Sequence, residues 1–126
     1  MRIVIDTHIL IWLLEGDIQL SESRRAILAN PTNQIFVSIA SLWETAIKIS
    51  SGKLSLSKPL SQIIDEITDS SSLILHIEPE HTLVVSTLPL HHRDPFDRII
   101  ISQAQVENLS VMTHDGAFAD YGITLL

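Results

Sequence analysis

The chain has 126 residues, of which 45% are hydrophobic and 18% charged, a balance that excludes a disordered chain and predicts one domain (1–126) with a buried core. It has no cysteine, which excludes disulfides and thiolate chemistry and suits the cytoplasm. Its first apolar run is interrupted by Asp6 and His8, which excludes a signal peptide and a membrane span there. The net charge of −7 disfavours contact with nucleic-acid phosphates on charge alone and favours a cation or a basic partner.

Short apolar runs alternate with helical patterns along the whole sequence. In chain order we expect a strand at 2–6, a helix at 8–15, a helix at 21–30, a strand at 34–38, a helix at 39–50, an extended segment at 53–59, a helix at 59–70, a strand at 73–77, a helix at 79–88, a helix at 94–108, a strand at 109–113 and a helical turn at 117–121. Strands that alternate with helices predict an α/β fold, a three-layer α/β/α sandwich with a central parallel sheet.

Four carboxylates stand close to the expected strand ends. Asp6 ends the first strand, Glu44 lies in the helix after the second, Asp97 begins the helix before the fourth, and Asp115 follows the fourth. The functional crevice of such a sheet lies beyond the carboxyl ends of its strands, so these acids can meet there. A divalent cation would relieve their repulsion, and oxygen ligands favour Mg²⁺ or Mn²⁺, ions that support phosphodiester hydrolysis.

The stretch "RDPFDR" holds two acids with different expected roles. Asp94 precedes Pro95 and fits a helix N-cap, which we take as its main role, with support of the site as a second one. Asp97 aligns with Ile101 and Ala104 on an apolar stripe, which predicts a partly buried carboxylate. Because a purely structural acid would face water, we favour a functional role for Asp97.

The other three acids also have structural interpretations. Asp6 can cap the following helix, Glu44 can be a solvated surface acid, and Asp115 with Gly116 can form a simple turn. Their expected convergence favours the metal site.

Four histidines lie near the expected site. His8 and His114 each stand within two residues of a proposed ligand and can orient a carboxylate or touch substrate, while His91 and His92 fit a phosphate-facing rim or an ordinary polar loop. Because their spacings are not those of a zinc site, we place them outside the metal shell.

Four blocks in this order carry a resemblance: "IDTHILIWLLEG", "VSIASLWETAIKISSGKL", "LPLHHRDPFDRIIISQAQ" and "VMTHDGAFADYGI". Together they resemble PIN-domain proteins, and the HHRDPFDR block is similar to the VapC-type toxin subgroup. The resemblance covers nearly the whole chain and implies an α/β/α fold with Mg²⁺- or Mn²⁺-dependent ribonuclease activity. By position, Asp6, Glu44, Asp97 and Asp115 match the family's first to fourth acids, the fourth being variable, and Asp94 matches a feature of the subgroup.

The resemblance also implies partners. A cognate antitoxin would control the nuclease, and one of its arginines can pair with Asp6 or Asp97 and displace the ion. We expect a homodimer, and candidate anchors for either partner are Ile11, Trp12 and Trp43. The alternative for each is a place in the core, which we favour over an interface for Trp43 but not for Trp12. Basic residues near the site that can hold an RNA backbone are Lys48, Lys53, Lys58, Arg93 and Arg98.

Other interpretations remain. A phosphorelay receiver domain is disfavoured because it needs a second acid near Asp6 and a lysine where "VMTHDG" has an acid. A haloacid-dehalogenase-type phosphatase is disfavoured because it needs an acid at the position of His8. A non-catalytic PIN-fold binding module and a housekeeping PIN nuclease both stay open.

Overall fold

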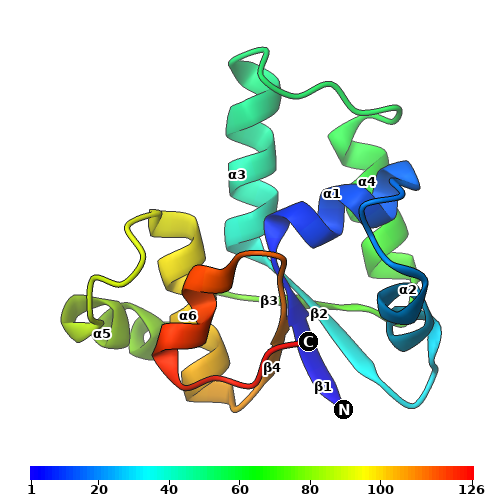
Figure 1. Cartoon of the computed structure of the whole chain (residues 1–126). Coiled ribbons are helices and arrows are strands. Elements are labelled where there is room, and N and C mark those ends of the chain that lie inside the picture. Colours follow the sequence, from blue (N-terminus) through cyan, green and yellow to red (C-terminus); the bar gives the residue numbers. More distant parts are fainter.

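A four-stranded, all-parallel sheet forms the centre of the molecule (Figure 1). The computed structural model describes residues 1–126. The strands are β1 (Arg2–Ile5), β2 (Gln34–Ser38), β3 (Leu73–Leu75) and β4 (Ser110–Met112), in the order β3-β2-β1-β4. The first strand of the chain is therefore an interior strand, and its three apolar residues after Arg2 have no exposed surface.

Helices follow or precede each strand. They are α1 (Thr7–Glu15), α2 (Glu22–Ala29), α3 (Ile39–Ser50), α4 (Leu60–Asp69), α5 (Pro79–Thr87) and α6 (Pro95–Glu107), with a 3₁₀ helix η1 (Gly116–Tyr121) near the C-terminus. None of them combines the length and the apolarity that crossing a membrane requires.

Two apolar layers cover the sheet, one on each face. Val4 of β1 packs in a cluster with residues of α6 and η1, such as Ile101 and Phe118. Its neighbours Ile3 and Ile5 point to the opposite face and pack in a second cluster with residues of α1 and α4. This alternation follows from the two-residue period of a strand. The expected α/β fold with helices around a central parallel sheet is confirmed.

Capping residues set the helix limits. Ser21 accepts a hydrogen bond from the Arg24 N–H at the start of α2, and Ser38 accepts one from the Ala40 N–H at the start of α3. The segment 53–59, expected to be extended, joins no strand of the sheet. It is tied instead to the end of α1, because the backbone N–H and the hydroxyl of Ser57 both donate to the Glu15 carboxylate.

The two tryptophans lie opposite to our expectations. Trp12 is only 9% exposed because it packs in the apolar cluster that contains Ile5 and Ile9, so it is not a free anchor for a partner. Trp43 is 58% exposed, and its assignment to the core is wrong. The buried residues of α3 are Ala40, Ser41, Glu44 and Thr45, and Trp43 lies outside this set. The helix extends beyond the ends of the strands (Figure 1).

Candidate metal centre

Asp6 lies at the junction of β1 and α1 and is only 2% exposed. Its Oδ1 accepts the Ile9 backbone N–H at 2.9 Å, so the carboxylate does cap α1. Its Oδ2 accepts the Thr113 hydroxyl at 2.5 Å. The cap uses one oxygen, and the second is directed toward the end of β4.

Asp115 stands beside Asp6 through the same threonine. The Asp115 N–H donates to the Thr113 hydroxyl oxygen at 2.9 Å, and Asp115 Oδ1 accepts the Ala117 N–H at 2.9 Å. Asp115 is thus the N-cap of η1, and its other oxygen, Oδ2, stays directed at the site. Thr113 links two acids that are 109 positions apart in the sequence, and the sequence pattern alone did not identify it.

Asp94 and Asp97 behave as the spacing predicts. Asp94 Oδ1 accepts the Asp97 N–H at 2.9 Å, which makes Asp94 the N-cap of α6, with Pro95 at the first helical position. The side chain of Asp97 is 19% exposed, so it is partly buried as expected. Asp94 therefore starts the helix whose first turn presents Asp97.

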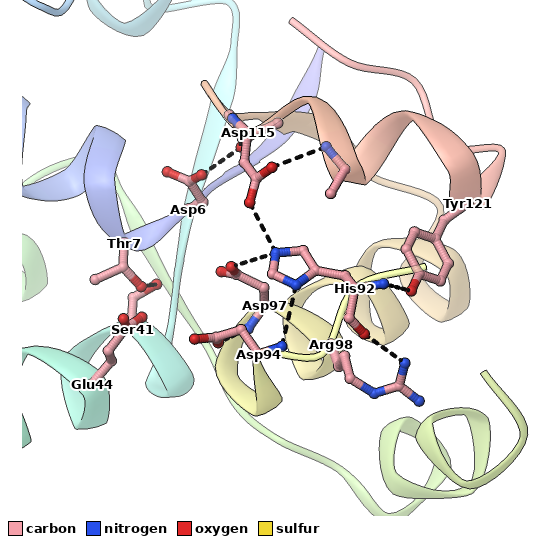
Figure 2. Close-up of polar contacts among 12 residues, drawn as sticks. Asp6, Thr7, Ser41, Glu44, His92, Asp94, Asp97, Arg98, Asp115 and Tyr121 are labelled. Atoms are coloured by element: carbon pink, nitrogen blue, oxygen red, sulfur yellow. Dashed lines mark hydrogen bonds and ion pairs between the residues drawn. The ribbon is translucent and has the colours of Figure 1, made fainter. Parts of the chain in front are cut away.

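His92 joins the two acids that come from α6 and from the β4 end. Its Nε2 lies 2.9 Å from Asp97 Oδ2 and 2.9 Å from Asp115 Oδ2, and Figure 2 shows the three side chains converging. All three ligand atoms lie within 4.8 Å of one another. Sequence reasoning left His92 as a rim or loop residue, because nothing local indicates a partner 23 positions later.

The other ring nitrogen of His92 defines its role. Nδ1 accepts the Asp94 backbone N–H at 3.2 Å, so the proton of the neutral ring sits on Nε2 and is donated to the carboxylates. A histidine that binds a metal usually donates its second ring N–H to a carbonyl or a carboxylate. His92 does the reverse, which fits a hydrogen-bond donor to the acids rather than a metal ligand.

Glu44 is buried on α3, apart from the group around His92 (Figure 2). Its Oε2 lies 3.1 Å from the Lys48 ammonium, and its Oε1 is sealed from solvent without any hydrogen-bond partner. The interpretation of Glu44 as a solvated surface acid is wrong, since the residue is 8% exposed. A hydrogen bond of 3.1 Å from the Thr7 hydroxyl to Ser41 joins α1 to α3 in the same region.

The surroundings of the site raise the pKa values of two of its acids, Asp97 and Asp6. Burial is the largest cause that raises the pKa of Asp97, followed by the charge of Asp94; with smaller contributions from Asp6 and Glu44, and against the opposing effect of His92, the pKa reaches about 7. Burial also raises the pKa of Asp6, against the hydrogen bonds from Ile9 and Thr113. The unpartnered Glu44 oxygen and the raised pKa values fit a hard divalent cation, for which carboxylate oxygens are the preferred ligands.

Of the basic residues near the site, Arg98 has an internal role. Its guanidinium donates to four backbone carbonyls, those of Val85, Leu88, Pro89 and His92, at 2.9–3.3 Å. Arg98 is therefore not available to hold an RNA backbone, because it fixes the loop between α5 and α6. Lys48 and Lys58 pair with glutamates, and Lys53 and Arg93 have neither a carboxylate nor a carbonyl partner for their side chains.

A buried glutamine connects the two acid-bearing helices. Gln103 of α6 accepts the Ser38 hydroxyl at 2.6 Å, and Ser38 is the N-cap of α3. The Gln103 amide also donates to the His76 carbonyl at 3.2 Å, just after β3. The contact sets the start of α3, which carries Glu44, against α6, which carries Asp97.

Known proteins resemble this chain in sequence family and in fold. The PIN domain family profile matches residues 3–123. The solved structure of VapBC2 from Rickettsia felis bound to a promoter DNA fragment is 21% identical, with a TM-score of 0.75, and the match covers 100% of this chain and 98% of that one. VapBC-1 from nontypeable Haemophilus influenzae is 18% identical, with a TM-score of 0.69 and coverage of 100% and 97%.

A toxin–antitoxin complex from Klebsiella pneumoniae is 22% identical, with a TM-score of 0.67 and coverage of 98% of this chain and 94% of that one. No curated protein matches the sequence significantly. At identities of 18–22%, the solved structures establish a fold that is shared with this chain. The family profile matches the sequence itself over residues 3–123 and is therefore evidence of family membership as well as of fold.

Proposed function

Because the chain belongs to the PIN domain family, we propose that its 126 residues act as one metal-dependent endoribonuclease domain, the toxin of a toxin–antitoxin pair. The observation that carries the proposal is a group of acids at the strand ends in which Asp6 and Glu44 are buried, the pKa values of Asp6 and Asp97 are raised, and one Glu44 oxygen has no partner. The family membership and this site support hydrolysis of RNA.

In this proposal, Asp6, Glu44, Asp97 and Asp115 would hold Mg²⁺ or Mn²⁺, and Asp94 would support the site as the cap of α6. A bound ion would activate water and neutralise charge on the scissile phosphate. The chain itself would keep Asp97 oriented through the α6 cap and the His92 hydrogen bond. Thr113 would keep Asp6 and Asp115 adjacent.

Cleavage of mixed RNAs by the purified protein tests the activity. We expect fragments with Mn²⁺ or Mg²⁺ and none with EDTA, and we expect Asp97→Asn to abolish cleavage because it removes the charge and keeps the shape. Asp65→Asn is the matched control, since Asp65 is an exposed acid on α4, and this variant should cleave normally. Activity that persists unchanged in EDTA contradicts a metal-dependent nuclease.

An antitoxin is the second part of the proposal. Two solved structures of similar fold are VapBC proteins and another is a toxin–antitoxin complex, which supports a protein inhibitor for this chain. The acidic site suits a basic segment whose arginine pairs with Asp6 or Asp97 and takes the place of the ion.

Growth assays test this second part. Expression of the chain alone in the cytoplasm should arrest growth, and co-expression of the neighbouring open reading frame should restore it. Unaffected growth together with RNA cleavage in vitro would favour a housekeeping PIN nuclease. Absence of both would favour a non-catalytic binding module.

A homodimer is the third part of the proposal, and an apolar hollow between α3 and α6 supports it. Trp43 lies edge-on to Phe96 with ring centroids 5.0 Å apart. These two rings, Ile77, Pro95 and Ile99 form an exposed apolar hollow that we name the Trp43 patch. Trp43 is 58% exposed, and its neighbours Ile77, Phe96 and Ile99 are partly buried. An apolar hollow with an exposed tryptophan is typical of a protein interface, so we assign the patch to a second copy of the chain.

A further inference from the structure

A cavity lined by aromatic side chains and by two of the acids opens beside the site, and the proposed chemistry assigns no role to its aromatic residues. The cavity measures about 430 Å³ and is lined by Asp6, His8, Trp12, Gln19, His114 and Asp115. It is the one cavity of the molecule with any of the four site acids in its wall. A molecule bound at the acids can therefore extend into it without leaving the surface.

Three rings stand next to one another in the cavity. The Trp12 ring centroid lies 6.1 Å from that of His8 and 5.4 Å from that of His114, with interplanar angles of 56° and 68°. Trp12 is nearly buried, whereas both histidines are exposed. The indole thus supports two imidazole rings whose outer faces are open to a ligand.

The polar atoms of these rings are also free. Neither imidazole makes a hydrogen bond within the chain. The indole N–H of Trp12 has no partner either, and it is not sealed from solvent, since Glu44 Oε1 is the only such sealed atom. Gln19 uses its amide nitrogen in a long contact of 3.4 Å with Asp17, and its amide oxygen remains unpaired. The cavity therefore offers ring faces together with hydrogen-bond donors and acceptors.

Charge decides which part of a nucleic acid fits this cavity. Two of its six lining residues are carboxylates and none is lysine or arginine, so a phosphate would be repelled. A nucleobase is uncharged, stacks on aromatic faces and carries amino and carbonyl groups at its edge.

We propose that the cavity lined by His8, Trp12 and His114 binds an unpaired nucleobase of the RNA next to the scissile phosphate. The proposal deepens the ribonuclease function and rests on it for the identity of the ligand as RNA. His8 and His114 supply the stacking faces, and Gln19 and the Trp12 N–H contact the base edge. These residues bind substrate and take no part in the hydrolysis itself.

Fluorescence of Trp12 provides a test that does not depend on cleavage. Trp12 and Trp43 are the two tryptophans of the chain, so Trp43→Phe leaves Trp12 as the single reporter. Titration of this variant with neutral nucleosides should quench or shift the emission in a saturable way, and ribose 5-phosphate should not. His8→Ala with His114→Ala should remove the saturable change. A response to ribose 5-phosphate equal to that of the nucleosides overturns the proposal.

Steady-state cleavage supplies the second test. Stacking of one base corresponds to roughly a 5- to 150-fold effect on affinity, so His114→Ala should raise KM by about tenfold with little change in kcat. His114→Phe should restore KM because it keeps the ring face. His76→Ala is the matched control, since its side chain is exposed and makes no hydrogen bond.

The two tests separate this proposal from the nuclease assignment. Cleavage by the wild-type chain with KM unchanged in the double alanine variant refutes the base site and leaves the nuclease intact. Nucleoside binding without any metal-dependent cleavage refutes the nuclease and retains the base site.

Discussion

At the scale of single residues, Asp97 combines burial with a concentration of negative charge. Burial and the neighbouring acids raise its pKa to about 7, above the ordinary value of 3.8, so the folded, metal-free protein binds a proton that the unfolded chain releases. The stability that this proton contributes is complete at about pH 4 and is lost as the pH rises toward 7.

The first prediction follows from this sign. The free energy of unfolding of the metal-free protein should fall between about pH 4 and pH 7, and the apparent Mn²⁺ affinity should rise over the same range because Asp97 must lose its proton to bind an ion. Asp97→Asn should remove most of the slope and should be more stable than the wild type at pH 8. Denaturant melts in EDTA at several pH values, with calorimetric Mn²⁺ titrations, measure both effects. Parallel pH curves for the two proteins would contradict the assignment.

The second prediction separates Asp94 from Asp97. Asp94→Ala removes the N-cap of α6 and should cost about 0.5–2 kcal/mol of stability while leaving residual cleavage. Asp94→Ser keeps a capping oxygen and should recover most of that stability. Asp97→Asn should lose activity without losing stability. Loss of all cleavage in Asp94→Ser at full stability would show that Asp94 takes part in the chemistry in addition to capping α6.

At the scale of elements, the loop between α5 and α6 depends on Arg98. One guanidinium holds four carbonyls from that loop and from the end of α5, and the loop carries His92. A lysine keeps the charge but cannot make the planar set of bonds.

The third prediction compares two arginines of the same segment. Arg98→Lys should destabilise the protein by about 1–3 kcal/mol because buried carbonyls lose their donors, and it should not change the salt dependence of RNA binding. Arg93→Ala should leave stability nearly unchanged and should reduce the slope of log affinity against log salt by about 0.7 if it contacts one phosphate. Melts and salt titrations on both variants decide this, and a reduced slope in Arg98→Lys would return that residue to the RNA-binding surface.

Local chemistry explains which elements the sequence could predict. The capping roles of Ser21, Ser38 and Asp94 are predictable from the sequence because each cap accepts a hydrogen bond from an N–H group only two or three residues later. The burial of Asp97 followed from the apolar stripe of its own helix. The role of His92 depends on Asp115 and the role of Arg98 on carbonyls of another element, so no local pattern indicated either. The placements expected for Trp12 and Trp43 were wrong because the hydrophobicity of a side chain does not show which side of its helix faces the core.

At the scale of the whole molecule, the Trp43 patch lies on the same helices as the acids. Trp43 precedes Glu44 on α3, and Phe96 precedes Asp97 on α6. A second copy that covered the patch would hold the two acid-bearing helices together from outside, where Gln103 and Ser38 already join them from inside.

The fourth prediction concerns that assembly. Light scattering should give about twice the chain mass of 14.0 kDa for the wild type, and Trp43→Glu should give a monomer because a charge in the apolar hollow opposes contact. Ile18→Glu is the matched control, since Ile18 is 96% exposed and outside the patch, and it should remain dimeric. A wild-type monomer at micromolar concentration, or a dimeric Trp43→Glu, would place the interface elsewhere or exclude it.

The position of β1 between β2 and β4 has a consequence during synthesis. Asp6 leaves the ribosome among the first residues, but its neighbour strand β4 and its partner Thr113 are made last, and their hydrogen bond spans 107 positions. A nascent chain that ends before Asp115 lacks an acid and one wall of the site. The acids of the site can therefore come together only after residues 1–115 have been synthesised, so the site forms late in the synthesis of this domain.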